Sequence, residues 1–131
     1  MTVAVAHQIS ATSRKALVQA VQEAKFRATD LAVLHVVDSI DADSQEAYRL
    51  GVADEIEKVV GQEPTIAWKL HLATAGSDLA DALLKLVDRI DADLLVIGAR
   101  RRSPVGKALL GSVAQTVILE ADLPVLVVKA P

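Results

Sequence analysis

The chain of 131 residues contains no cysteine and very few aromatic side chains, with one Phe, one Tyr and one Trp. Without cysteine there is no disulfide framework and no thiolate chemistry, and this composition fits a reducing cytoplasm. The shortage of aromatic rings disfavours a flavodoxin-like electron carrier, which needs rings around its flavin. It also disfavours single-stranded nucleic-acid binding by base stacking.

The chain also lacks a long apolar run and a strong charge of either sign. No apolar run approaches the ~18 residues that a membrane span requires. The first ten residues, MTVAVAHQIS, lack the basic segment that begins a signal peptide. A net charge of −3 provides no general attraction to nucleic acid or anionic lipid. We therefore expect a soluble, cytoplasmic protein with no nucleic-acid and no membrane partner.

A hydrophobic content of 52% is enough for one well-buried domain, which we expect to cover residues 1–131 because no linker or repeat interrupts them. Short apolar runs alternate with segments of helical periodicity. Strands are predicted at Val3–His7, Leu31–Val37, Thr65–Ala73, Asp93–Gly98 and Pro124–Lys129, and helices at Ser13–Ala28, Asp43–Val60, Ser77–Ile90 and Ser112–Ala121. Strands joined by helical crossovers lie parallel, so the pattern predicts an α/β fold: a five-stranded, doubly wound parallel sheet with helices on both faces.

Several local signals set the ends of these elements. Asp43 and Glu46 have the spacing of a capping box at the start of the second helix, and Gly61 is a suitable stop for it. Ser77 is a suitable cap for the third helix. Residues 65–73 alternate apolar and polar, which favours a strand buried on one face near a sheet edge.

The longest connection between expected elements reads GARRRSPVGKALLGS and runs from Gly98 to Ser112. In doubly wound sheets, ligands bind outside the carboxyl ends of the strands, and long loops are often functional. Glycines allow a phosphate to approach the backbone, and a helix beginning near Ser112 offers unpaired N–H groups. Basic side chains supply countercharge for a phosphate; they are Arg100, Arg101, Arg102 and Lys107. The same residues also fit a second interpretation, in which a solvated basic loop precedes an ordinary helix cap. Neither GxGxxG nor GxxxxGK[ST] is present, so both interpretations stay open.

Other candidate chemistry is weaker. The three histidines are not spaced like a metal site, and the acidic pairs near residues 41–43 and 91–93 lie beside helix ends, where they cap and solvate. We expect no metal site and no catalytic residue. His35 lies inside an apolar strand and is expected to be a hydrogen-bonded core or interface residue. His7 ends the first strand and is kept as a possible ligand contact.

The stretch IGARRRSPVGKALLGSVAQTVILEADLPVLVVK closely resembles the C-terminal signature of the universal stress proteins. HVVD after the second strand and GSDLADALLKLVDRIDADLLVIGAR are similar to the same family. The resemblance covers nearly the whole chain. It implies the strand order 3-2-1-4-5 and a pocket for ATP or a related adenine nucleotide, with or without Mg²⁺, at the carboxyl ends of strands one and four.

The resemblance also implies which residues contact the nucleotide. Nucleotide-binding members carry Gly-x-x-Gly, nine residues, then Gly-Ser or Gly-Thr. Gly98, Gly111 and Ser112 match this motif, but Arg101 stands at its second glycine. The aspartate that ends the first strand in those members is His7 or Gln8 here. The implied phosphate-binding residues are Gly98, Arg100, Arg101, Gly111, Ser112 and Val113, and the implied nucleoside-binding residues are Ala6, His7, Gln8, Val36 and Val37.

Two functions follow as alternatives: a nucleotide-linked regulatory protein, or a stress-related interaction module that binds no nucleotide and acts through a dimer surface. The resemblance extends at most to slow nucleotide hydrolysis or self-phosphorylation at Ser112, and no residue reads as a general base. The last strand is almost wholly apolar and lies at a sheet edge in the expected order, and exposed edges pair with other chains. The family's habit of dimerising through this strand implies a homodimer through Val125–Lys129.

Overall fold

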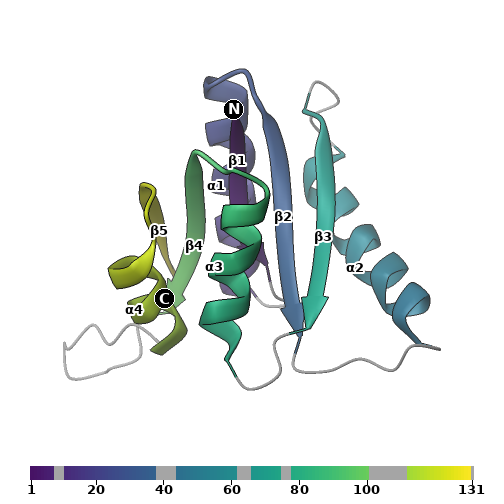
Figure 1. Cartoon of the computed structure of the whole chain (residues 1–131). Coiled ribbons are helices and arrows are strands. Elements are labelled where there is room, and N and C mark those ends of the chain that lie inside the picture. Colours follow the sequence, from purple (N-terminus) through teal and green to yellow (C-terminus); the bar gives the residue numbers. More distant parts are fainter. Residues whose placement is uncertain (8–10, 38–43, 62–65, 75–77, 101–111, 131) are drawn as a thin grey trace.

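The computed structural model describes residues 1–7, 11–37, 44–61, 66–74, 78–100 and 112–130 (Figure 1). Nine elements alternate along these residues in the predicted sequence of strands and helices, and their ends lie within three residues of the predicted ones. They are β1 (Thr2–His7), α1 (Ala11–Phe26), β2 (Asp30–Val37), α2 (Gln45–Val60), β3 (Trp68–Thr74), α3 (Leu79–Arg89), β4 (Leu94–Arg100), α4 (Ser112–Glu120) and β5 (Val125–Ala130).

The five strands form one parallel sheet in the order β3-β2-β1-β4-β5, as predicted. The arrowheads of β2, β3 and β4 point the same way in Figure 1, and β1 and β5 pair in parallel with them, so the carboxyl ends of the strands share one edge of the sheet. β3 and β5 are the two edge strands. The order reverses between β1 and β4, and this reversal is where doubly wound sheets bind their ligands.

α1 and α2 cover one face of the sheet, and α3 and α4 cover the other (Figure 1). In β1, Val3 and Val5 pack into a core with α1 and α2, whereas Ala4 belongs to the core formed with α3 and α4. All three side chains are fully buried, because successive residues of a strand point to opposite faces and both faces are covered. α1 packs closely through buried alanines at helical spacing, namely Ala16, Ala20 and Ala24.

The helix ends differ from the sequence prediction in several details. α1 ends at Phe26 rather than Ala28, because Ala28 has a φ of 52° and so leaves the right-handed helix. α3 is capped by Asp78, not Ser77: the Asp78 carboxylate accepts the backbone N–H of Asp81 at 3.0 Å. A carboxylate here both satisfies an unpaired N–H and carries negative charge at the positive end of the helix dipole. Ser77 lies outside the described residues.

α2 begins one residue later than the expected capping box. Its N-cap is Ser44, which makes no side-chain capping hydrogen bond, and Asp43 lies outside the described residues. Gly61 ends the helix as predicted, and its N–H donates to the Glu57 carbonyl at 2.8 Å. Its φ of −60° is right-handed, so this stop does not use the conformational freedom of glycine.

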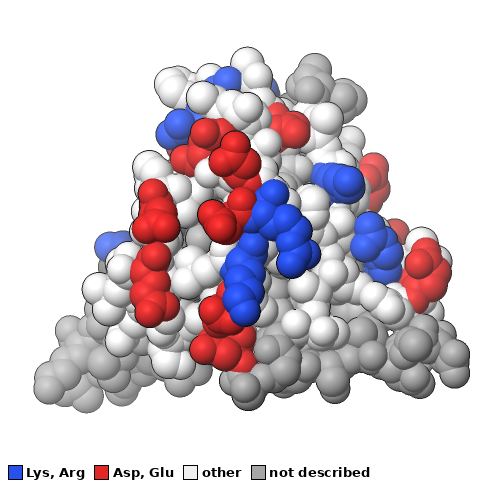
Figure 2. Space-filling view, in the orientation of Figure 1, with Lys and Arg blue, Asp and Glu red and all other residues white. Residues whose placement is uncertain are grey.

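The face covered by α3 and α4 carries acidic and basic side chains next to one another (Figure 2). Lys85, for example, pairs with Asp81 one turn away on α3 at 3.0 Å. The part of this face that the structure describes therefore has no broad basic surface of the kind that follows a nucleic-acid backbone. Among the described helices, none combines the length and the apolar character needed to cross a bilayer.

Candidate functional site

The two central strands separate at their carboxyl ends. Paired positions of β1 and β4 run only from Val3↔Leu94 to Val5↔Val96, although β4 continues to Arg100. By contrast, β1 stays paired with β2 to its last residue, where His7 lies opposite His35. The strand reversal and the end of the β1–β4 ladder thus coincide at one edge of the sheet.

Two buried histidines lie at this edge. His7 is 6% exposed and His35 is 3% exposed. They share the strand parity of Val3 and Val33, so both point to the face covered by α1 and α2. This confirms that His35 is a hydrogen-bonded core residue. The register of β1 on β2 brings the two rings together, with the Nδ1 atoms 3.1 Å apart.

A third side chain extends this contact to α2. The hydroxyl of Tyr48 lies 2.8 Å from Nε2 of His35, so hydrogen bonds run from β1 through β2 to α2. The ring centroids of His7 and His35 are 5.3 Å apart, and those of His35 and Tyr48 are 5.7 Å apart. We call these three residues the His–His–Tyr chain. Buried polar groups that satisfy one another in this way order a site and hold it in one arrangement.

Burial keeps both imidazoles neutral at physiological pH. Desolvation, helped by repulsion from His35, lowers the pKa of His7 from 6.5 to about 4, although Glu55 on α2 acts in the opposite direction. Desolvation also lowers the pKa of His35, and hydrogen bonding to the backbone of His7 opposes that effect. The site therefore holds neutral hydrogen-bonding groups rather than a positive charge at this point.

The residues expected to contact the nucleoside are divided between the two faces. His7 points to the α1 and α2 side, whereas Ala6 and Val36 pack with the core under α3 and α4. Val37 is half-buried as the last residue of β2, and Gln8 lies outside the described residues. Their strand ends nevertheless meet at one edge, because β1 and β2 are parallel neighbours.

The residues expected to contact phosphates begin and end the connection from β4 to α4. Gly98 is half-buried and pairs with Val128 of β5, and Arg100 is the last residue of β4. Ser112 is exposed as the first residue of α4, so it lies one position inside the helix rather than at the cap. Val113 packs against the core under α3 and α4.

Because α4 leads into the amino end of β5, its first turn lies toward the carboxyl edge of the sheet. Arg101 and Gly111 lie outside the described residues.

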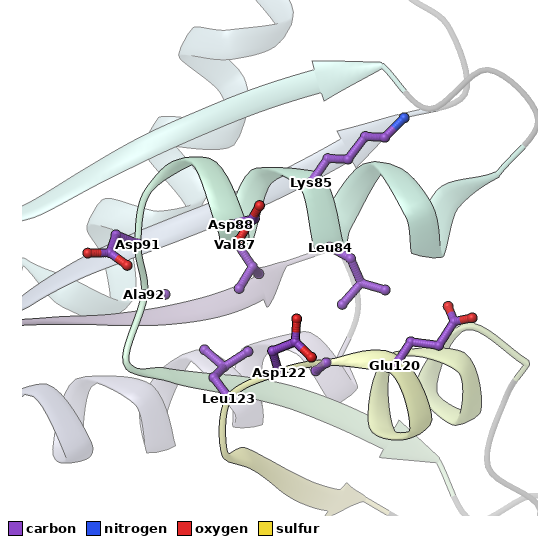
Figure 3. Close-up of a pocket in the computed structure, with 10 residues that line it drawn as sticks. Leu84, Lys85, Val87, Asp88, Asp91, Ala92, Glu120, Asp122 and Leu123 are labelled. Carbon is purple, nitrogen blue, oxygen red and sulfur yellow. The ribbon is translucent and has the colours of Figure 1, made fainter.

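A separate pocket of about 360 Å³ lies between α3 and the segment from α4 to β5. Figure 3 shows Leu84 and Val87 of α3 pointing toward the segment that holds Asp122 and Leu123. This pocket adjoins the amino ends of β4 and β5, and four of its five charged lining residues are acidic; these five are Lys85, Asp88, Asp91, Glu120 and Asp122. It therefore suits neither the position nor the charge expected for a phosphate site.

The sequence prediction did not identify Tyr48 as a hydrogen-bonding partner. It placed Tyr48 only within the expected second helix, Asp43–Val60. The available signal was that the first two strands each carry a histidine at the fifth position of an apolar run, which neighbouring parallel strands bring side by side. Within the ranges that the structure describes, no three His, Asp or Glu side chains come together as a metal-binding group.

Comparison with known proteins identifies one family. A family model described as the universal stress protein family matches residues 1–129. A universal stress protein of Mycolicibacterium smegmatis is 40% identical over 122 residues, which cover 88% of this chain and 88% of that protein.

Solved structures of similar proteins share the fold. The universal stress protein from Archaeoglobus fulgidus in complex with dAMP is 26% identical, with a TM-score of 0.76 and 98% of each chain covered. A universal stress protein in complex with cAMP is 27% identical, with a TM-score of 0.74, covering 100% of this chain and 98% of the other.

Proposed function

This chain belongs to the universal stress protein family, and on that premise we propose that it is a cytoplasmic regulatory protein that binds ATP or a related adenine nucleotide. The nucleotide lies at the carboxyl ends of β1 and β4. The observation that carries the proposal is the end of the β1–β4 ladder at Val5↔Val96, where the strand order reverses. The dAMP and cAMP complexes of two relatives support an adenine nucleotide as the ligand class.

In this proposal the strand ends hold the nucleoside, and the connection from β4 to α4 holds the phosphates. Gly98 permits close approach of a phosphate to the backbone, and the first turn of α4 offers N–H groups from Ser112 and Val113. Arg100 supplies countercharge, and Arg101 and Gly111 are the other residues of this connection that we assign to the phosphates. The nucleoside contacts are Ala6, His7, Gln8, Val36 and Val37.

The test is equilibrium binding of ATP, with and without Mg²⁺, to protein stripped of co-purified nucleotide. We expect micromolar affinity that is lost in Gly111→Val and in Ser112→Val, because each substitution obstructs the phosphates. Leu119→Ala is the control, since Leu119 lies near the other end of α4 and is 83% exposed. Absence of binding at millimolar ATP, or full affinity in both valine variants, would refute the proposal.

Arg101 distinguishes two forms of the same site. An arginine at a position that the family motif gives to glycine either obstructs the phosphate or contacts it through the guanidinium. Arg101→Gly therefore strengthens ATP binding in the first case and weakens it in the second. An unchanged affinity would exclude both roles for Arg101.

A second candidate function is an interaction module that acts through a homodimer, and the position of β5 favours it. Among the described strands β5 pairs only with β4, and Val125–Val128 are half-buried rather than buried. We propose that residues Val125–Lys129 pair with their counterparts in a second copy, which would cover this edge.

Backbone direction makes this dimer testable. The carbonyl of Pro124 accepts the N–H of Leu95, so the backbone groups of Pro124 point toward β4 and those of Val127, three residues on, point outward. Val127→Pro removes an outward N–H without removing a hydrogen bond to β4. In sedimentation we expect a dimer for the wild type and for Val127→Ala, and a monomer for Val127→Pro. A monomeric wild type would refute the dimer.

A further inference from the structure

The His–His–Tyr chain contains a hydrogen bond between two identical atoms. Nδ1 of His7 and Nδ1 of His35 lie 3.1 Å apart, and both rings are neutral at pH 7.5 because burial lowers the pKa of each. A neutral imidazole carries one proton, so one Nδ1 must donate and the other must accept. The position of the proton on one ring therefore fixes its position on the other.

Only two proton orders satisfy both hydrogen bonds. In the first, the Tyr48 hydroxyl donates to Nε2 of His35, Nδ1 of His35 donates to Nδ1 of His7, and His7 keeps its proton on Nε2. In the second, every bond is reversed: Nδ1 of His7 donates, Nε2 of His35 donates to the Tyr48 oxygen, and Nε2 of His7 is a bare acceptor. Nε2 of His7 is thus a hydrogen-bond donor in the first order and an acceptor in the second.

Chemistry favours the first order at the Tyr48 end. A phenol O–H is more acidic than the N–H of a neutral imidazole, and an imidazole nitrogen is a stronger base than a phenol oxygen. The Tyr48 hydroxyl is therefore the better donor and Nε2 of His35 the better acceptor. With Nε2 of His35 accepting, its proton must be on Nδ1, which faces His7.

One further group favours the same order. Hydrogen bonding to the backbone of His7 raises the pKa of His35, and a backbone carbonyl can only accept, so it favours a proton on the side of His35 that faces β1. The negative charge of Glu55 on α2 also raises the pKa of His7, but this effect acts on the ring as a whole and selects neither of its nitrogens. Lys58, one turn further along α2, pairs with Glu55 at 3.2 Å.

We propose that Tyr48 is a positioning residue that orders the protons from Tyr48 through His35 to His7, so that His7 presents an Nε2–H donor at the carboxyl end of β1. For a ligand, and this consequence rests on the proposed function, His7 then matches an acceptor such as a sugar or phosphate oxygen rather than an amino group. The side chain of Tyr48 acts through His35 and need not touch the ligand.

The test is the ¹⁵N spectrum of the histidine rings in nucleotide-free protein at pH 7.5, where protonated and bare nitrogens resonate in separate regions. We expect the proton on Nε2 in His7 and on Nδ1 in His35. His71→Gln assigns the third histidine, which lies on the edge strand β3. A proton on Nδ1 of His7 in the wild type would overturn the proposal.

Tyr48→Phe removes the donor and keeps the aromatic ring. We expect both histidine rings to shift toward a mixture of the two tautomers in this variant, while circular dichroism shows that the fold is retained. Unchanged tautomers in Tyr48→Phe would show that Tyr48 does not set the order, which also overturns the proposal.

ATP titration separates this inference from the proposed function. We expect Tyr48→Phe to bind ATP about 2-fold more weakly than the wild type, because an equal mixture of the two tautomers halves the fraction of protein that presents the donor. Equal affinity of the two proteins would overturn the stated consequence for the ligand. If the wild type binds no ATP, the proposed function fails, and the ring spectra alone still decide the proton order.

Discussion

The two buried histidines at the end of β1 and β2 make stability depend on pH in a predictable direction. Burial lowers the pKa of His7 from 6.5 to about 4, so the unfolded chain binds this proton more readily than the folded one. The stabilisation is complete above pH 6.5 and is lost as the pH falls toward 4. His35 contributes in the same direction because its pKa is also lowered.

The size of the effect follows from the pKa difference. Since His7 is only 6% exposed, solvent screens the effect little. Relative to neutral pH, His7 alone costs about 2 kcal/mol of unfolding free energy at pH 5 and about 3 kcal/mol at pH 4. Because the folding of a small domain typically contributes only about 5–15 kcal/mol, this loss is measurable by urea denaturation.

The assay compares the fall in unfolding free energy between pH 7.5 and pH 5 in the wild type and in His7→Gln. The variant removes the titrating group, so we expect its curve to be flatter by about 2 kcal/mol over this range. The carboxylates contribute equally to the pH dependence of both proteins, so their contribution cancels when one curve is subtracted from the other. His71→Gln is the matched control: His71 is half-buried on β3 and its pKa is also lowered, so its removal flattens the curve less.

The reasoning is refuted if His7→Gln shows the same pH dependence as the wild type. It is also refuted if the wild type becomes more stable as the pH falls from 7.5 to 5. The general loss of stability that Gln causes at a buried site does not affect the test, because the readout is the change with pH and not the absolute value.

Three further predictions concern stability at neutral pH, each measured by urea denaturation. Tyr48→Phe is expected to cost about 1–3 kcal/mol, because a buried nitrogen of His35 loses its partner; no loss would show that water replaces the hydroxyl. Asp78→Ala is expected to cost about 1 kcal/mol through loss of the α3 cap, whereas Asp88→Ala, later on the same helix, costs less; equal costs would contradict the capping role. Leu34→Ala is expected to cost about 2–5 kcal/mol because Leu34 is 1% exposed, whereas the largely exposed Leu119→Ala changes stability by less than about 0.5 kcal/mol.

The order of strands and helices could be predicted because hydrophobic periodicity is a local property. The apolar run from Leu31 to Val37 and the alternation in residues 65–73 both led to strands where the structure has them. The helix starts were less accurate: Ser77 and Asp78 are both capable caps, and only their placement on α3 decides that Asp78 accepts the N–H. The end of α1 was missed because the φ of Ala28 depends on how the chain enters β2.

The candidate site was predictable as a place but not as a set of contacts. Strand ends and the basic loop pointed to the carboxyl ends of β1 and β4, and the structure separates those strands there. The contact of His7 with His35 joins residues 28 positions apart, and Tyr48 comes from a third element. The register of β1 on β2 cannot be read from a local sequence pattern, so periodicity alone could not predict that these side chains meet.

By itself the sequence determined the parallel α/β class, the family and the composition of the β4–α4 connection, because these depend on residue types and their spacing along the chain. Only the tertiary structure decided which side chains share a face and which are buried. Strand register brings His7 beside His35, and packing of α2 on the sheet brings Tyr48 to His35 and removes the rings from water. Burial then lowers the histidine pKa values, because an imidazolium loses its hydration in the core and nothing within a single segment of the chain supplies that effect.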